Sequence, residues 1–133
     1  MSCWLETKSW PEAEEAIAQS GGVAIIPVGS VEQHSLHLPV GTDTYVAITL
    51  AEDAANQTGA VVTPPVWFGW SPHHMVRPGT ITIRPEVLAD LTYDIIASLA
   101  QHGLKKGKRQ IGRRIESGRR VCQNMRGTHR DSQ

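Results

Sequence analysis

The chain has 133 residues, and its 13 Lys and Arg residues balance its 13 Asp and Glu residues, so the formal net charge is zero. This length is typical of a single domain, and the neutral balance excludes a uniformly basic nucleic-acid-binding protein. The balance hides an asymmetry, because residues 1–104 carry a net charge of −8 and residues 105–133 a net charge of +8. We therefore expect two chemically different pieces.

Cysteine content and hydropathy indicate the redox compartment of the chain and whether it contacts a membrane. Cys3 and Cys122 are too few and too far apart for a disulfide framework or a zinc knuckle. The longest apolar runs, such as residues 23–28, are too short to cross a bilayer, and the N-terminus lacks the basic and apolar regions of a signal peptide. We expect a reduced, cytoplasmic setting without membrane contact.

The first half of the acidic piece alternates helix and strand patterns. Residues 11–19 predict a short helix, with Pro in its first turn and two glycines after it. The apolar run 23–28 is typical of a strand buried on both faces. A polar loop follows, and residues 43–56 then predict a helix that presents one apolar face, made of Val46, Leu50 and Ala54.

The second half repeats the alternation. Residues 60–63 predict a strand that ends at two prolines, and residues 80–83 predict a third strand. Residues 85–102 predict the longest helix, which ends at Gly103 and carries an apolar stripe of Val87, Leu88, Leu91, Ile95 and Leu99. Strands that alternate with helices indicate an α/β fold with a mainly parallel sheet. We therefore expect residues 1–104 to form one α/β domain.

Residues 105–133 break this pattern. Few of them are apolar and glycines interrupt them, so the segment is a poor candidate for a buried strand or a covered edge. Few apolar residues and a high net charge are typical of disorder. A basic tail would bind anionic partners electrostatically, but it has no aromatic residue for base stacking and no nucleic-acid recognition motif. We expect no specific nucleic-acid partner.

The loop after the first predicted strand holds the residues with the most chemistry. Its sequence, from Gly29 to Asp43, is GSVEQHSLHLPVGTD. Ligands of open α/β sheets collect where strands end, and extended backbone would place Glu32 and His34 on the same side. With Asp43, these side chains supply two carboxylates and one imidazole, a donor set that suits Zn²⁺, Mn²⁺ or Fe²⁺.

The same residues have interpretations that need no metal. Thr42 or Asp43 could be the N-cap of the following helix, where a carboxylate is favoured by the helix dipole. Glu32 and His34 could be an exposed pair in a loop, and His37 an ordinary surface histidine. Spacing alone leaves these alternatives open.

A resemblance favours the metal site. The run IIPVGSVEQHSLHLPVGTDTYVA, followed by SPHHMVRPGTITI and a helix that ends QHGLKK, resembles the creatinine amidohydrolase (creatininase) family over about residues 5–106. The resemblance implies a three-layer α/β/α sandwich and a homo-oligomer. It also implies a hydrolase that acts on non-peptide C–N bonds, such as those of creatinine, of formamide groups or of a modified precursor peptide. The family usually has Gly-Pro where this chain has Ser35-Leu36.

The resemblance also implies roles for individual residues. Glu32, His34 and Asp43 fall on metal ligands, with Asp43 bridging the two ions of a binuclear zinc or manganese site. Ser71 falls on a serine that contacts substrate, and His74 is placed in the substrate loop. General acid and base residues are not identified.

The resemblance ends near Leu104. Family members continue with a buried strand and an Asn-Gly-His motif that supplies further metal ligands, whereas the only later histidine here is His129. We expect a C-terminally truncated domain with half of the metal site, impaired hydrolysis, and a tail at 105–133 that is disordered or out of frame. The alternative is a non-catalytic binding module whose basic tail contacts anionic partners.

Two further features are open to more than one interpretation. Trp67, Phe68 and Trp70 could form an aromatic wall for a planar substrate, although such clusters more often belong to a core or a subunit contact. Arg77 could contact a substrate anion or be an ordinary surface arginine.

Overall fold

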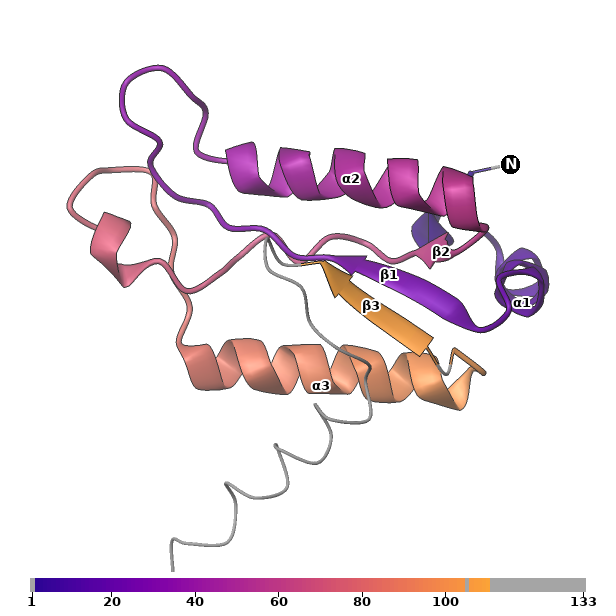
Figure 1. Cartoon of the computed structure of the whole chain (residues 1–133). Coiled ribbons are helices and arrows are strands. Elements are labelled where there is room, and N and C mark those ends of the chain that lie inside the picture. Colours follow the sequence, from indigo (N-terminus) through magenta and orange to yellow (C-terminus); the bar gives the residue numbers. More distant parts are fainter. Residues whose placement is uncertain (1, 105, 111–133) are drawn as a thin grey trace, which may run out of the picture.

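A small parallel sheet lies between helices in the computed structural model, which describes residues 2–104 and 106–110 (Figure 1). The strands are β1 (Val23–Pro27), β2 (Val61–Val62) and β3 (Lys106–Gln110), in the order β2–β1–β3. The α-helices are α1 (Trp10–Gln19), α2 (Thr42–Thr58) and α3 (Pro85–Gln101), and the short 3-10 helices are η1 (Leu5–Thr7) and η2 (Pro72–His74). The predicted α/β class with a parallel sheet is confirmed.

Strand β1 supports two separate cores because successive residues of a strand point to opposite faces. Ile25 packs on the α2 side, in a cluster completed by Ala51, Ala55, Ala60 and Val62. Ala24 packs on the other side with Val61 and Leu104, and α1 and α3 cover that cluster with Ala16, Ile17 and Leu99. The strand is therefore buried on both faces, as its apolar run predicts, and helices cover both sides of the sheet (Figure 1).

Strand β3 forms where the sequence pattern predicts no strand. Residues 106–110 were expected to be too polar for a strand, yet they pair in parallel with β1 from Val23 opposite Lys106 to Pro27 opposite Gln110. Strand pairing uses backbone N–H and C=O groups, so β3, the outer of the described strands on that side of β1, can pair without apolar side chains. Residues 111–133 are outside the described part of the chain. The predictions that this segment is disordered or out of frame, and that His129 lacks the family's Asn-Gly-His motif, therefore stay predictions.

The predicted strand at residues 80–83 does not form. Ile81 instead makes one antiparallel bridge to Val31, and Thr82 makes one parallel bridge to Gly69. The segment therefore pairs with two different loops, which prevents a continuous ladder with either. It ties together the loop after β1 and the loop after β2.

The helices lie within a residue or two of their predicted positions, but α2 presents a different face to the core. Its buried residues are Thr44, Ala51 and Ala55, whereas Val46 and Leu50 are 52% and 45% exposed. Small side chains let the helix axis approach the sheet closely, and the larger aliphatic residues are turned outward. On α3, Leu88, Ile95 and Leu99 are half-buried, while Val87 and Leu91 of the predicted stripe are exposed.

No helix within residues 2–104 is long and apolar enough to cross a membrane. The N-terminal segment instead extends the sheet, since Trp4 bridges to Val62 and its indole N–H donates to Glu52 Oε1 at 2.6 Å.

Gly29 sets the distance between the end of β1 and the first turn of α2. A Cβ atom at this position would lie 2.5 Å from the Thr44 Cα and 2.7 Å from the Thr44 Cβ. Thr44 is itself fully buried, so it has no room to move aside. Only glycine allows the two backbones to approach this closely, and that approach brings Asp43 to the end of β1.

The substitution Gly29→Ala tests this close approach. Overpacking of this kind costs about 1–3 kcal/mol, so we expect a lower free energy of unfolding in urea titrations. Gly41→Ala is the matched control, because its added Cβ would meet the Tyr45 ring at 3.2 Å, and Tyr45 is an exposed side chain that can shift. Equal losses in the two variants would contradict the special role of Gly29.

Candidate metal centre

Three segments meet at the carboxyl end of β1. They are the loop at 28–41, the first turn of α2, and the loop at 63–84 that leads into α3 (Figure 1). Backbone hydrogen bonds join the two loops, from Gly29 N to Val66 O at 2.9 Å and from Ile81 N to Val31 O at 2.9 Å. This edge of an α/β sheet is where ligands usually bind.

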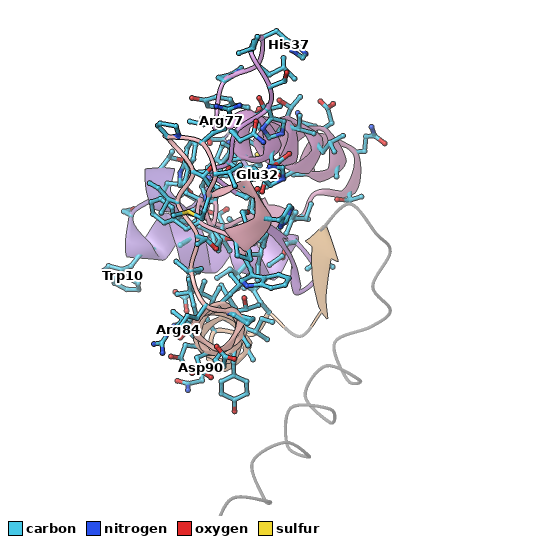
Figure 2. The ribbon with its side chains drawn as sticks, turned by 90° about the vertical axis from the view of Figure 1, so that its left-hand side faces the viewer. Trp10, Glu32, His37, Arg77, Arg84 and Asp90 are labelled. Carbon is cyan, nitrogen blue, oxygen red and sulfur yellow. The ribbon has the colours of Figure 1, made fainter. Side chains whose placement is uncertain are left out.

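Glu32, His34 and Asp43, the three predicted metal ligands, lie together at this edge. One ligand atom from each lies within 4.8 Å of the others, and all three residues are half-buried. The closest pair is His34 Nε2 and Asp43 Oδ1, at 3.4 Å. His37 stands apart, at the outer tip of its loop (Figure 2). Of the two histidines in the motif, the structure brings only His34 to the carboxylates.

The tautomer of His34 follows from its backbone contact. Its Nδ1 lies 2.9 Å from the carbonyl oxygen of Glu32, and a carbonyl can only accept, so Nδ1 carries the proton. A neutral ring then directs the lone pair of Nε2 toward the Asp43 carboxylate. Backbone carbonyls orient metal-ligating histidines in this way.

When His34 is neutral, its Nε2, Asp43 Oδ1 and a Glu32 oxygen are acceptors that lie close together, and a cation stabilises such an arrangement. Two carboxylates and an imidazole are suitable donors for Zn²⁺ or Mn²⁺. The residues present therefore fit a divalent metal ion. Without a metal, a proton on His34 can take the place of the cation.

Asp43 is held by its surroundings rather than by a capping role. The N-cap of α2 is Gly41, so the proposed capping role of Thr42 or Asp43 is wrong, and Asp43 lies in the first turn. The Ser30 hydroxyl donates to Asp43 Oδ2 at 2.6 Å, which leaves Oδ1 to face His34. Sequence reasoning missed Ser30, although its position next to Gly29 in the motif was a usable signal.

Ser71 and His74, the predicted substrate residues, both contact Glu32. Ser71 is only 1% exposed, and its hydroxyl donates to Glu32 Oε2. His74 Nε2 lies 3.5 Å from the other oxygen, Oε1, while the neighbouring His73 is exposed. Contact with a substrate stays a prediction for both residues. Ser71 and His74 thus surround the Glu32 carboxylate from the loop at 63–84.

Trp67 lies at the start of α2, the helix whose first turn holds Asp43. Trp67 packs edge to face on Tyr45, with ring centroids 5.7 Å apart. Trp67, Phe68 and Trp70 are 37%, 44% and 56% exposed, so they are not part of the core within the described residues. Arg77 is exposed on the same loop, and the role of each in substrate binding stays a prediction.

The turn at Ser35-Leu36 keeps a conformation that favours glycine. Ser35 has φ 59°, and no other residue except glycine has a positive φ in the described part of the chain. Its backbone N–H donates to Gln33 Oε1 at 3.0 Å, and His34 and Leu38 bridge across the turn. Ser35 therefore adopts a left-handed backbone conformation that glycine would adopt without steric cost.

Comparisons with known proteins identify a family for the chain. The family model "Creatininase: Creatinine amidohydrolase" matches residues 6–107. Among curated proteins, "3-dehydro-scyllo-inosose hydrolase" of Thermotoga maritima is 35% identical over 104 residues, which are 77% of this chain and 33% of that protein. "Creatinine amidohydrolase" of Pseudomonas putida is 29% identical over 110 residues, 79% of this chain and 42% of that protein.

Solved structures show the same fold. "Creatininase Mn" superposes with a TM-score of 0.80 at 26% identity, covering 98% of this chain and 52% of that one. A creatininase variant described as "Zn-Zn type" has the same TM-score and coverage at 25% identity. The chain thus spans about half the length of these structures, and less than half of the two curated relatives.

The charge state of His34 gives a prediction for the metal-free protein. The hydrogen bond to the Glu32 carbonyl, and after it the negative charge of Asp43, raise the pKa of His34 above its ordinary value of 6.5. A raised pKa in the folded state means that protonation stabilises the fold. This contribution is complete below the unfolded-state pKa and is lost as the pH rises through the folded-state pKa.

In chelator-treated protein, we therefore expect the midpoint of thermal unfolding to fall as the pH rises from about 6 to about 8. His34→Gln removes the titrating group, and we expect it to flatten this part of the curve. A wild-type midpoint that rises over the same interval would contradict the assigned contacts of His34.

Proposed function

Because the chain belongs to the creatininase family, we propose that Glu32, His34 and Asp43 form the metal-binding part of an amidohydrolase centre for a small substrate with a non-peptide C–N bond, such as a cyclic amide or a formamide. The observation that carries the proposal is the convergence of one ligand atom from each of the three residues, all within 4.8 Å of one another, with His34 Nε2 3.4 Å from Asp43 Oδ1.

The number of donors defines what the centre can hold. Catalytic zinc sites commonly combine three protein ligands with one open position for water. The three donors of the described residues therefore suit a single ion, with Zn²⁺ and Mn²⁺ as the candidate metals. A binuclear site with Asp43 as the bridging carboxylate would need further ligands, and we propose that hydrolysis is impaired without them.

The side chains have distinct parts in this proposal. A bound metal supplies a Lewis acid and lowers the pKa of its water to about 7. Ser30 orients the Asp43 carboxylate, and the Glu32 carbonyl keeps His34 in the tautomer that leaves Nε2 free. The exposed aromatic residues Trp67, Phe68 and Trp70 would form an apolar wall for the substrate. Self-assembly into an oligomer is part of the same proposal, by analogy with the family.

Metal titration tests the binding part. We expect the chelator-treated protein to take up a single Mn²⁺ or Zn²⁺ ion per chain, and His34→Ala to weaken the affinity by at least about tenfold, because a donor is lost. His37→Ala is the matched control, since His37 belongs to the same loop and points away from Glu32 (Figure 2). Uptake that is unchanged in His34→Ala would contradict the proposed ligand set.

Hydrolysis assays test the catalytic part. With Mn²⁺ or Zn²⁺ present, we expect little or no release of product from creatinine or from simple formamides, compared with the Pseudomonas putida enzyme under the same conditions. Turnover near that of the full-length relative, if lost in His34→Ala, would overturn the proposed impairment and retain the amidohydrolase assignment. If the protein binds metal but does not bind creatinine, this result would argue against a small-amide substrate.

A further inference from the structure

A chain of contacts leads from the backbone of Ser35, through Gln33 and His74, to the Glu32 carboxylate. The Ser35 N–H lies 3.0 Å from Gln33 Oε1, and Gln33 Nε2 lies 2.9 Å from His74 Nδ1. His74 Nε2 then faces Glu32 Oε1 at 3.5 Å. Neither the metal-ligand set nor the substrate residues account for Gln33.

The donor in each hydrogen bond of this chain of contacts follows from the first group, the backbone N–H of Ser35. A backbone N–H can only donate, so the Gln33 atom that it contacts is the carbonyl oxygen, and the other amide atom is the NH₂ donor. That donor lies against His74 Nδ1, which must therefore accept. The proton of a neutral His74 is then on Nε2, the nitrogen that faces the negatively charged Glu32.

The two partners of this contact are also tied together through a buried hydroxyl. Thr80 Oγ1 accepts from the backbone N–H of Gln33 at 3.1 Å and donates to the carbonyl of His74 at 3.0 Å. Thr80 is 9% exposed. The side chains of Gln33 and His74 thus approach each other from backbones that are already fixed, and their contact is not a chance meeting of two surface groups.

We propose that Gln33 is a positioning residue that fixes His74 as the Nε2–H tautomer and thereby orients the Glu32 carboxylate. In this arrangement Ser71 holds Oε2 and His74 faces Oε1, so each carboxylate oxygen has its own partner. The effect on metal affinity rests on the proposed metal site, whereas the tautomer does not. Groups that orient metal ligands typically change metal affinity by about 10- to 100-fold when removed.

The tautomer can be measured directly in the metal-free protein. Long-range ¹H–¹⁵N correlation spectra distinguish protonated from unprotonated ring nitrogens, and the His74 signals are assigned by their loss in His74→Asn. At a pH where the ring is neutral, we expect His74 to carry its proton on Nε2. A proton on Nδ1 in the wild-type protein would overturn the proposal without the need for any variant.

Two substitutions test the part played by Gln33. Gln33→Leu removes the donor, so we expect mixed His74 tautomers and a Mn²⁺ affinity lower by about 10- to 100-fold. Gln33→Glu can only accept, so we expect it to draw a proton onto Nδ1. Signals of the exposed His37 and His102 should stay unchanged in both variants, which shows that the fold is intact.

Gln19→Leu is the matched control, because the exposed Gln19 side chain donates to Glu15 on the surface of α1. An unchanged His74 tautomer and an unchanged Mn²⁺ affinity in Gln33→Leu would contradict the positioning role. Absence of metal uptake by the wild-type protein would contradict the proposed function, and the tautomer measurement would still decide whether Gln33 fixes His74.

Discussion

The close approach of Gly29 to Thr44 is the constraint on which the site depends. Strand β1 ends in a loop that carries Glu32 and His34, while Asp43 belongs to the first turn of the next helix. These residues meet because the helix begins in direct contact with the backbone at the strand end, where a Cβ atom would overlap Thr44. The small residues Ala51 and Ala55 continue the same close packing along α2. Packing that stabilises the sheet therefore also assembles the candidate metal ligands.

The polar contacts around the centre then set the direction of each donor. Ser30 engages one oxygen of Asp43, Ser71 engages one oxygen of Glu32, and a backbone carbonyl holds Nδ1 of His34. One ligand atom from each of the three residues thus lies within 4.8 Å of the others. A divalent cation bound there would contact all three residues, which links the local geometry to the proposed metal-dependent function.

Sequence patterns predicted the α/β class, the helices and the cluster of Glu32, His34 and Asp43. They failed where backbone pairing or close packing, and not the pattern of apolar side chains, determines the structure. The apolar run of β1 and the motif from Gly29 to Asp43 were informative because burial and metal binding both select particular side chains. Strand β3 was missed because backbone pairing with β1 tolerates Lys and Arg residues. The aliphatic residues Val46 and Leu50 pointed to the wrong face of α2, since close packing on the sheet selects small residues instead. Gln33 was missed as a positioning residue because its partner, His74, is 41 residues away in the sequence.

The position of a bound metal tests the central claim most directly. Crystals of the protein soaked in Mn²⁺ would give an anomalous signal that locates the ion without any assumption about activity. We predict a peak in contact with His34 Nε2 and with carboxylate oxygens of Glu32 and Asp43. A fully occupied Mn²⁺ peak elsewhere on the protein, or no peak at these three residues under conditions where Mn²⁺ binds in solution, would contradict this account.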